Sequence, residues 1–361
     1  MSNENSLNRN SNLSVGTSTS AAPASVRSQS ENVVMIAAGA GSFQTAFNET
    51  IIAPFLKETG IEIVYREQLS EDLLKLQVDS GNVDVDVASL TGTPFRLRPE
   101  ELLEEIDYDV FDKESLAGLL PQAKARFGVG SYVYSTNLAL STQDWGDRQA
   151  GPESWREFWD VERFPGARTL LSMSAGHTST AAFALIADGV APSDVYPFDF
   201  DRVFRSLDNI RKDVAKFWTV GNEPLELLSG GQVTMGSAWS GRAQAAINQN
   251  APVAFTWNQA ELSAAYWVVP RGARHKEAAM RFLAYWSRAD TQARFQSRLV
   301  YGPTNVNAAS LMDAKLVARL PTAPANLERQ FWRNDQWLNE LGPNGQTNRK
   351  ELIERWNKWA A

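Results

Sequence analysis

The chain of 361 residues contains no cysteine and only two histidines, His177 and His275. Disulfide bonds, thiolate metal sites and cysteine nucleophiles are therefore excluded, and so is a metal site built from several histidines. No run approaches the roughly 18 consecutive apolar residues that a membrane-spanning helix needs. Basic residues are also few, because 35 Lys and Arg stand against 42 Asp and Glu, a net charge of −7. That balance argues against a nucleic-acid partner, and the composition implies neither a cofactor nor a metal.

Residues 1–32 are rich in Asn and Ser, and they lack the continuous apolar segment of a signal peptide. We expect them to form a disordered leader, because so little apolar surface cannot offset the entropy of ordering. Order is expected to begin at Val33.

Strand-like and helix-like patterns alternate from Val33 onward. Residues 33–100 give strand, helix, strand, helix, strand, which predicts an α/β lobe with a mostly parallel sheet. Farther along, the pattern predicts a helix over 201–217. It also predicts two separate strands in PVAFTWNQ (252–259) and SAAYWVVP (263–270).

Four strand ends run into loops of small or hydroxyl residues that precede a helix. They read AGAGSFQTAF, ASLTGTPF, SMSAGHTSTA and GSAWSGRAQ. The C-terminal ends of strands and the N-termini of helices are where α/β sheets bind ligands. Each loop alone is explained by ordinary helix capping. Four together, with Phe43, Trp239 and the nearby Tyr266, favour a binding site.

No enzyme signature is complete. AGAGSFQ lacks the third glycine of a dinucleotide loop, because Gln44 stands there, and neither a P-loop nor a G-x-S-x-G elbow exists. His275 lies at a polar helix start and is expected on the surface. His177 is the better functional candidate, so a His177-dependent hydrolase or transferase stays open as an alternative that needs a catalytic partner.

Several segments, in their order along the chain, resemble the polyamine-type solute-binding proteins, the spermidine/putrescine receptors of ABC importers. These segments are APFLKETGIEIVY, VDVDVASL, SWREFWDVERFPG, MGSAWSGRAQAA, AAYWVVPRGARHKEAAMRFLAYWSRADTQARF and YGPTNVNA. The resemblance covers residues 33–361 and implies the two-lobe periplasmic-binding-protein fold of type II, with mixed sheets flanked by helices and a ligand cleft between the lobes. One lobe would comprise 33–136 with 265–312, and the other 137–264 with 313–361.

The same resemblance implies hinge closure around a small molecule, an ABC permease of the inner membrane as partner, a monomer, and a periplasmic location, although the sequence shows no signal peptide. It also implies ligand-binding positions in this sequence. These are Phe43, Gln44, Ser89, Thr91, Ser172, Ser174, His177, Thr178, Trp239, Ser263, Tyr266, Tyr301 and Arg333.

The departures from the family pattern concern charge. Ala265 stands where polyamine receptors have an Asp, the loop 172–180 has no acid, and Arg333 replaces an amide. A buried diammonium ligand without a carboxylate would be unpaired, whereas Arg and hydroxyls suit a carboxylate. We therefore expect a carboxylate-bearing or zwitterionic solute, such as an amino-acid conjugate or opine.

Three alternatives to this interpretation remain open. In the first alternative, the ligand is a polyamine whose ammonium groups pair with Glu223 or Asp335. In the second, Arg333 pairs with Asp335 at the surface and does not contact the ligand. The third alternative, a ferric ion or inorganic oxyanion, is weakened by the lack of clustered Tyr, His and acidic residues.

Overall fold

The computed structural model describes residues 32–91, 98–146, 151–174 and 176–361. The expected leader, 1–32, lies outside the described residues except for Asn32. Residues Asn32–Ala361 form one compact unit. Among the described residues, no helix is both long enough and apolar enough to cross a bilayer.

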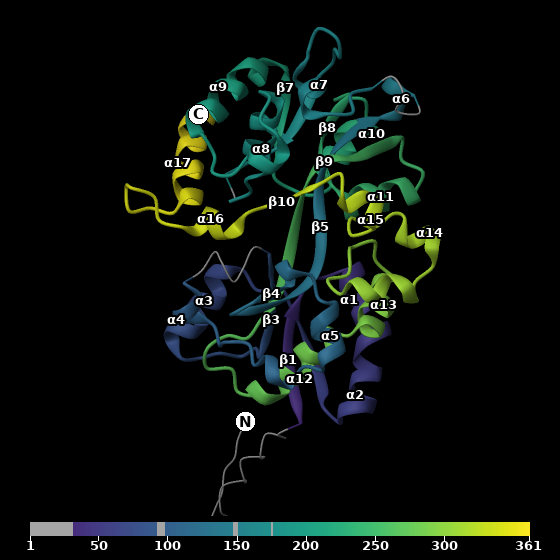
Figure 1. The fold of residues 1–361 in the computed structure, drawn as a ribbon, viewed down its shortest axis with the longest axis vertical. Coiled ribbons are helices and arrows are strands. Elements are labelled where there is room, and N and C mark those ends of the chain that lie inside the picture. Colours follow the sequence, from purple (N-terminus) through teal and green to yellow (C-terminus); the bar gives the residue numbers. More distant parts are fainter. Residues whose placement is uncertain (1–31, 92–97, 147–150, 175) are drawn as a thin grey trace, which may run out of the picture. The chain divides into compact units, whose positions relative to one another are not determined.

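The unit is built on one mixed sheet with the strand order β2-β1-β3-β9-β5-β8-β6-β7 (Figure 1). Its centre is the antiparallel pair of two long strands, β5 (Gly128–Ser141) and β9 (Val253–Val268). The other pairs on the two wings are parallel, except where β3 and β8 join the central pair. The remaining strands are β1 (Val33–Ala38), β2 (Glu62–Glu67), β3 (Val87–Thr91), β4 (Lys124–Ala125), β6 (Arg168–Leu171), β7 (Val214–Trp218), β8 (Met235–Trp239) and β10 (Phe331–Trp332).

Helices lie on both sides of the sheet (Figure 1). Their ends follow local chemistry: Ser70 caps α3 by accepting a hydrogen bond from the Leu73 N–H, and Gly81 ends it in the left-handed conformation. The helices are α1 (Ser42–Phe47), α2 (Ala53–Thr59), α3 (Glu71–Ser80), α4 (Pro99–Leu102), α5 (Lys113–Gly118), α6 (Thr142–Trp145), α7 (Trp155–Trp159), α8 (Ser179–Ala187), α9 (Phe200–Ile210), α10 (Glu223–Ser229), α11 (Ser240–Asn248), α12 (Lys276–Trp286), α13 (Ala289–Gln296), α14 (Ala314–Val317), α15 (Pro324–Leu327), α16 (Asp335–Asn339) and α17 (Asn348–Ala360).

Two sequence-based element assignments are wrong. The expected pair of strands over 252–259 and 263–270 is the single strand β9, which absorbs the irregular stretch through a register shift against β5 and a positive φ at Gln259. The expected helix 201–217 ends at Ile210. A 3-10 turn, Arg211–Asp213, follows it, because Val214–Trp218 pair in parallel with β6 as strand β7. In both places, pairing with distant strands overrides the local pattern.

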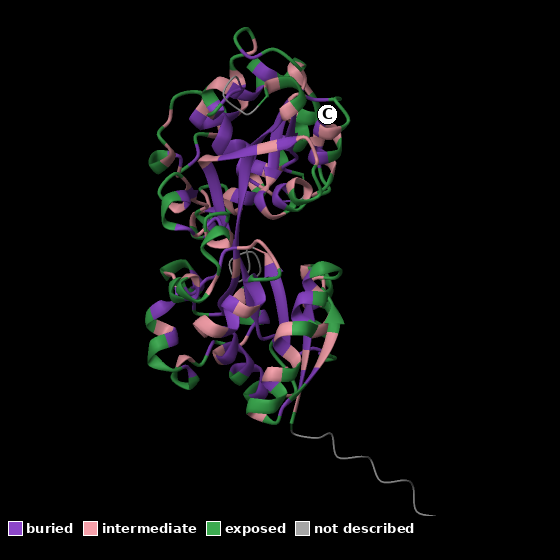
Figure 2. Cartoon of the chain, turned by 90° about the vertical axis from the view of Figure 1, so that its right-hand side faces the viewer, coloured by how far each residue is buried: buried purple, intermediate pink, exposed green. Residues whose placement is uncertain are grey.

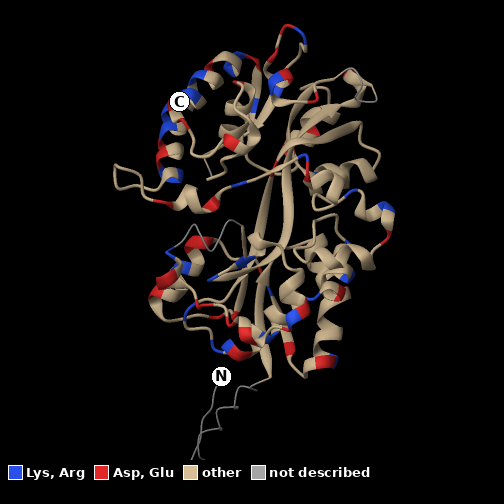
Figure 3. Cartoon of the chain, viewed as in Figure 1, with Lys and Arg blue, Asp and Glu red and all other residues tan. Residues whose placement is uncertain are grey.

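The buried side chains fall into groups on either wing of the sheet, while β5 and β9 are buried along most of their length (Figure 2). One core includes Phe47, Trp267 and Phe295, and another includes Trp155, Phe183 and Trp356. Charged residues gather on the helices, and β5 carries none (Figure 3). The lobe bounds 33–136 with 265–312 and 137–264 with 313–361 stay a proposed division.

His275 is not the surface residue that the sequence suggests. Its side chain is 13% exposed, and its Nδ1 lies 2.9 Å from the Oδ2 atom of Asp86. The other oxygen of this buried carboxylate accepts the His275 backbone N–H, while Oδ2 also accepts the N–H of Met35 in β1. His275 therefore fastens the start of α12 to the sheet.

Candidate ligand-binding site

A cavity of about 240 Å³ lies at the centre of the sheet, where strand ends from both wings meet. Thr91 ends β3, Trp239 ends β8, and Arg242 lies in the first turn of α11. Tyr132 and Tyr134 are two residues apart on β5 and therefore share one face of the strand. We call this cavity the aromatic pocket; its lining residues are Gln68, Thr91, Tyr132, Tyr134, His177, Trp239, Arg242 and Tyr301.

Five aromatic rings of this lining lie close to one another. The ring centroids of Tyr132 and Tyr301 are 4.5 Å apart, those of Tyr134 and Trp239 are 6.4 Å apart, and that of His177 lies 5.5 Å from Trp239. Interplanar angles of 30°, 78° and 59° mean that the rings form walls of different orientation. Such an arrangement offers both ring faces and ring edges to a bound molecule.

Two glycines make room for these rings. A Cβ atom on Gly241 would lie 2.7 Å from the Cε1 atom of Tyr301, and one on Gly221 would lie 2.7 Å from the Cζ3 atom of Trp239. Both distances are shorter than ordinary van der Waals contact. The glycine in WSGRAQ thus lets the aromatic ring of a distant loop pack directly on the start of α11.

Arg242 is the one cation among the described lining residues of the aromatic pocket. Its side chain is exposed, and no described carboxylate forms an ion pair with it. Among the described lining residues, the aromatic pocket thus presents one guanidinium group and no carboxylate.

The hydroxyls of Tyr132 and Tyr301 are uncharged donors and acceptors. Burial raises the pKa of Tyr132 well above its usual value and raises that of Tyr301, while the nearby Arg242 cation acts in the opposite direction on both. Neutral hydroxyls beside a guanidinium suit a ligand oxygen that carries negative charge.

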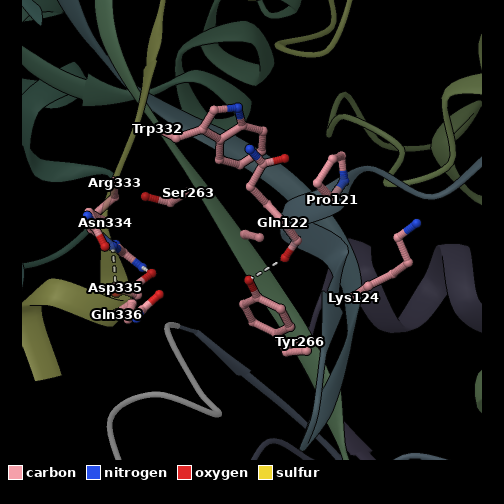
Figure 4. A pocket seen from close by; sticks show the side chains of 12 residues that line it. Pro121, Gln122, Lys124, Ser263, Tyr266, Trp332, Arg333, Asn334, Asp335 and Gln336 are labelled. Atoms are coloured by element: carbon pink, nitrogen blue, oxygen red, sulfur yellow. Dashed lines mark hydrogen bonds and ion pairs between the residues drawn. The ribbon is translucent and has the colours of Figure 1, made fainter. Parts of the chain in front are cut away.

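Arg333 lines a second cavity of about 350 Å³ (Figure 4), which we call the Arg333 pocket. Figure 4 shows Arg333 against Asp335, and Tyr266 donating its hydroxyl hydrogen to the Gln122 carbonyl at 2.7 Å. The lining residues are Pro121, Gln122, Lys124, Ala125, Ser263, Ala264, Tyr266, Trp332, Arg333, Asn334, Asp335 and Gln336.

The Arg333 charge is compensated within the protein. Its Nε and Nη2 atoms donate to the two carboxylate oxygens of Asp335, each at 2.9 Å, with side-chain exposures of 6% and 10%. Burial would lower the pKa of Arg333, but Asp335 raises it well above its usual value. This pairing is the alternative considered from the sequence, except that it is buried rather than at the surface.

Arg349 extends this ion pair toward the aromatic pocket. Its Nη2 atom donates to Asp335 at 2.7 Å, and its Nη1 atom donates to the carbonyl of Gly176 at 2.8 Å. Gly176 directly precedes His177, which lines the aromatic pocket. The C-terminal segment therefore holds the loop that positions His177.

The two acids considered for polyamine binding are both occupied. Asp335 is shared by Arg333 and Arg349. Glu223 lies outside the lining of either pocket and pairs with Lys216. This pairing, with the Thr219 and Val220 N–H groups, lowers the pKa of Glu223 to about 2.

The thirteen ligand-binding positions expected from the sequence divide into three groups. Four line the aromatic pocket: Thr91, His177, Trp239 and Tyr301. Three line the Arg333 pocket: Ser263, Tyr266 and Arg333. The remaining six line neither of these cavities: Phe43, Gln44, Ser89, Ser172, Ser174 and Thr178.

The positions outside these cavities have structural surroundings. Phe43 packs in the aromatic core, with its ring centroid 4.9 Å from that of Phe295. Gln44 lies half-buried in α1, and the carbonyl of Ser89 accepts a hydrogen bond from Gln68. The hydroxyls of Ser172 and Ser174 hydrogen-bond each other. Thr178 precedes α8, but its side chain does not cap the helix.

Sequence reasoning missed Gln68, Tyr132, Tyr134 and Arg242 as lining residues. Arg242 stands three residues after Trp239 in WSGRAQ, so the loop was identified and its cation was not. The alternation SYVYST indicates that Tyr132 and Tyr134 share a face. Which face meets the pocket depends on pairing with β9, which the local sequence does not contain.

Glu261 is a fully buried acid on the central strand β9. Ser179 at the start of α8 donates to it at 2.5 Å and the Tyr196 hydroxyl at 3.1 Å. Burial raises its pKa, while Arg333, Ser179 and Tyr196 act in the opposite direction and Asp335 adds to the rise. The net rise means that the folded protein holds this proton more tightly than the unfolded chain.

A pH dependence of stability follows from this shift. Because the folded pKa is raised, the contribution of Glu261 is fully present below the unfolded pKa of about 4.3 and is lost as pH rises through the folded value. Relative to Glu261→Gln, the wild-type free energy of unfolding should therefore fall from about pH 4 toward neutrality. Urea unfolding of both proteins across this range measures the difference, and a constant difference would contradict the shift.

The two wings of the sheet are joined by the long strands β5 and β9, and strand ends from both wings meet at the aromatic pocket. This is the arrangement of the two-lobe solute-binding proteins. The chain belongs to the bacterial extracellular solute-binding proteins, whose family model matches residues 50–325.

Two curated relatives place the chain within this class. It is 32% identical over 343 residues to the gamma-aminobutyric acid-binding protein of Pseudomonas aeruginosa, covering 93% of this chain and 92% of the relative. It is 21% identical over 305 residues to the spermidine/putrescine-binding periplasmic protein of Escherichia coli, covering 81% and 83%. The resemblance to the polyamine-type receptors is thereby confirmed.

Solved structures agree with the two-lobe fold. An ABC transporter substrate-binding protein from Bradyrhizobium japonicum matches with a TM-score of 0.82 and 31% identity, over 91% of this chain and 99% of that one. A gamma-aminobutyric acid (GABA) receptor matches with a TM-score of 0.80 and 31% identity, over 91% and 98%. A binding protein of A. tumefaciens in complex with glucopine matches with 0.76 and 27%, over 91% and 99%. The protein is a solute-binding receptor of an ABC transporter.

Proposed function

We propose that this receptor captures a small carboxylate-bearing solute, zwitterionic in character, and that Arg242 receives the carboxylate. The observation that carries the proposal is the Arg242 guanidinium, which no described carboxylate neutralises in a pocket lined by neutral hydroxyls. Arginine matches a carboxylate through two parallel N–H donors. Arg333, expected from the sequence to take this role, is already bonded in this way to Asp335.

The ligands named for similar proteins support this class. GABA carries a carboxylate and an ammonium group, and glucopine is an opine. The cavity of about 240 Å³ lies just below the usual range for drug-sized ligands, which suits a compact solute.

The pocket also supports capture by hinge closure. Thr91 and Tyr301 approach from the wing of β1–β3, whereas His177, Trp239 and Arg242 approach from the wing of β6–β8. A solute that contacts both groups would favour the arrangement in which they are close. We propose that the closed receptor, as a periplasmic monomer, delivers this solute to an inner-membrane ABC permease.

A thermal-shift screen tests the ligand class. Polyamines, ω-amino acids, opines and phosphonates should each be added to the purified chain at equal concentration. A ligand at 100 times its dissociation constant stabilises the folded state by about 2.7 kcal/mol. Stabilisation by amino-acid-like carboxylates and not by polyamines is expected, whereas the reverse order would contradict the proposal.

The glycine beside Tyr301 gives a test within the pocket. Gly241→Ala suits helix α11 by propensity but places a Cβ atom against the Tyr301 ring, which must move. We expect the variant to fold normally and to bind GABA at least about fivefold more weakly, since such crowding costs about 1 kcal/mol or more. Calorimetric titration measures the affinity, and thermal unfolding serves as the control; unchanged affinity would show that Tyr301 does not contact the solute.

A further inference from the structure

The aromatic pocket contains no described acid that could pair with the cationic end of a zwitterionic ligand. Its charged lining residue is Arg242, and the remaining lining groups are aromatic, hydroxyl or amide side chains. Ala265, opposite Tyr132 in the β5–β9 ladder, contributes only a methyl group. Neighbouring acids are engaged elsewhere: Asp335 by two arginines, and Glu261 by Ser179 and Tyr196.

A primary ammonium group is poorly matched to such a lining. It is compact and strongly hydrated, and it carries three N–H donors that need acceptors once water is removed. Gln68 and the tyrosine hydroxyls provide neutral acceptors, but neutral groups return less than a carboxylate does.

A quaternary ammonium group matches the lining better. It has no N–H donor to satisfy, and its methyl groups spread the positive charge over an apolar surface. The faces of Trp and Tyr rings attract such a cation within about 6 Å of the ring centroid. Four such rings line the pocket in differing orientations: Tyr132 and Tyr301 pack on each other with centroids 4.5 Å apart, and Tyr134 and Trp239 meet edge to face at 6.4 Å.

The rings also hold fixed positions. The ring of Tyr132 lies 5.8 Å from that of Phe43 in the buried core, and the ring of Trp239 lies 5.2 Å from that of fully buried Trp218. Gly241 and Gly221 let Tyr301 and Trp239 sit directly against the backbone. A preformed box of rings needs little reorganisation on binding, which favours affinity.

We propose that the aromatic pocket selects a carboxylate solute whose cationic end is N-methylated, with Arg242 holding the carboxylate and the rings of Tyr132, Tyr134, Trp239 and Tyr301 surrounding the quaternary ammonium group. This inference rests on the proposed function and narrows its ligand class. A carboxylate at this end of the pocket would favour a primary ammonium group, whereas the aromatic lining is expected to favour a quaternary one.

Calorimetric titration of the full chain tests the inference with three carboxylates, each of which has three methylene groups between its carboxylate carbon and its other end. The probes are 4-aminobutanoate, 4-(trimethylammonio)butanoate and 5,5-dimethylhexanoate. The last, which we call the neutral isostere, carries an uncharged tert-butyl group in place of the trimethylammonium group. We expect the trimethylammonio compound to bind at least about tenfold more tightly than each of the others, the size of a desolvated cation–π contact. Equal or tighter binding of 4-aminobutanoate would overturn the inference, and so would equal binding of the neutral isostere.

Two Trp→Leu variants, one inside the pocket and one outside it, distinguish a loss of cation recognition from a general effect on folding. Trp239→Leu should reduce the preference for the trimethylammonio compound over its neutral isostere by about tenfold, whereas Trp257→Leu, at a half-buried position outside the pocket, should leave it unchanged. An unchanged preference in Trp239→Leu would also overturn the inference. If none of the three carboxylates binds the wild-type chain, the proposed function itself fails, and the inference fails with it.

Discussion

Replacing Arg242 by Ala is expected to weaken carboxylate binding by about 10- to 100-fold, the value of losing charge-assisted hydrogen bonds to one anionic group. Arg242 is exposed and is bonded to no described carboxylate, so its removal should leave the fold intact. Calorimetric titration with 4-aminobutanoate and its trimethyl derivative measures the loss. Arg242→Lys should retain part of the affinity, since an ammonium group keeps the charge but not the two parallel donors.

A matched arginine provides the control for this experiment. Arg281 is also exposed on a helix, pairs with Glu277 at the surface and lies outside the described lining of the aromatic pocket. Arg281→Ala should bind both probes as the wild type does. Wild-type affinity in Arg242→Ala would remove the central contact of the proposed function.

Replacing Asp335 by Ala is expected to cost about 3–5 kcal/mol of unfolding free energy, because two buried guanidinium groups lose their shared carboxylate. The midpoint of thermal or urea unfolding measures this loss. Asp79→Ala, which removes an exposed partner of Lys75 on α3, is the matched control and should change stability by less than about 1 kcal/mol.

The same network separates stability from affinity at Arg333. If Arg333 is structural, Arg333→Ala should lower stability while the remaining protein keeps its affinity for carboxylates, since Asp335 still pairs with Arg349. An affinity loss as large as that of Arg242→Ala, at undiminished stability, would return Arg333 to the binding role. A loss of stability in Asp335→Ala no greater than in the control would contradict the buried network.

Local patterns predicted much of the fold, because caps and apolar periodicity act over a few residues. The strand-helix alternation expected for residues 33–100 is present, and α3 within it begins after Ser70 and ends at Gly81. The single strand β9 was not predicted, because its continuity depends on pairing with β5 across more than a hundred residues of chain. Strand β7 was missed for the same reason, since β6 supplies its partner.

The candidate site was predicted in part. Four positions that the family resemblance implies line the aromatic pocket: Thr91, His177, Trp239 and Tyr301. Arg333 and Arg242 could not be ranked from the sequence, because the difference lies in a neighbour: Arg333 meets Asp335 two residues later, and Arg242 meets no described acid. The expectation of an anionic ligand group depended on the missing acids and on Arg333. Because Arg333 is paired with Asp335, the hypothesis now depends on Arg242 and stays a prediction.

The most direct test of the central claim compares 4-aminobutanoate with putrescine. Both compounds have four-carbon chains with an ammonium group at one end, and they differ in carrying a carboxylate or a second ammonium group at the other. Equilibrium titration of the purified receptor should show binding of 4-aminobutanoate that depends on Arg242, and no measurable binding of putrescine. Putrescine binding that is as tight as or tighter than that of 4-aminobutanoate, and unchanged in Arg242→Ala, would contradict the account.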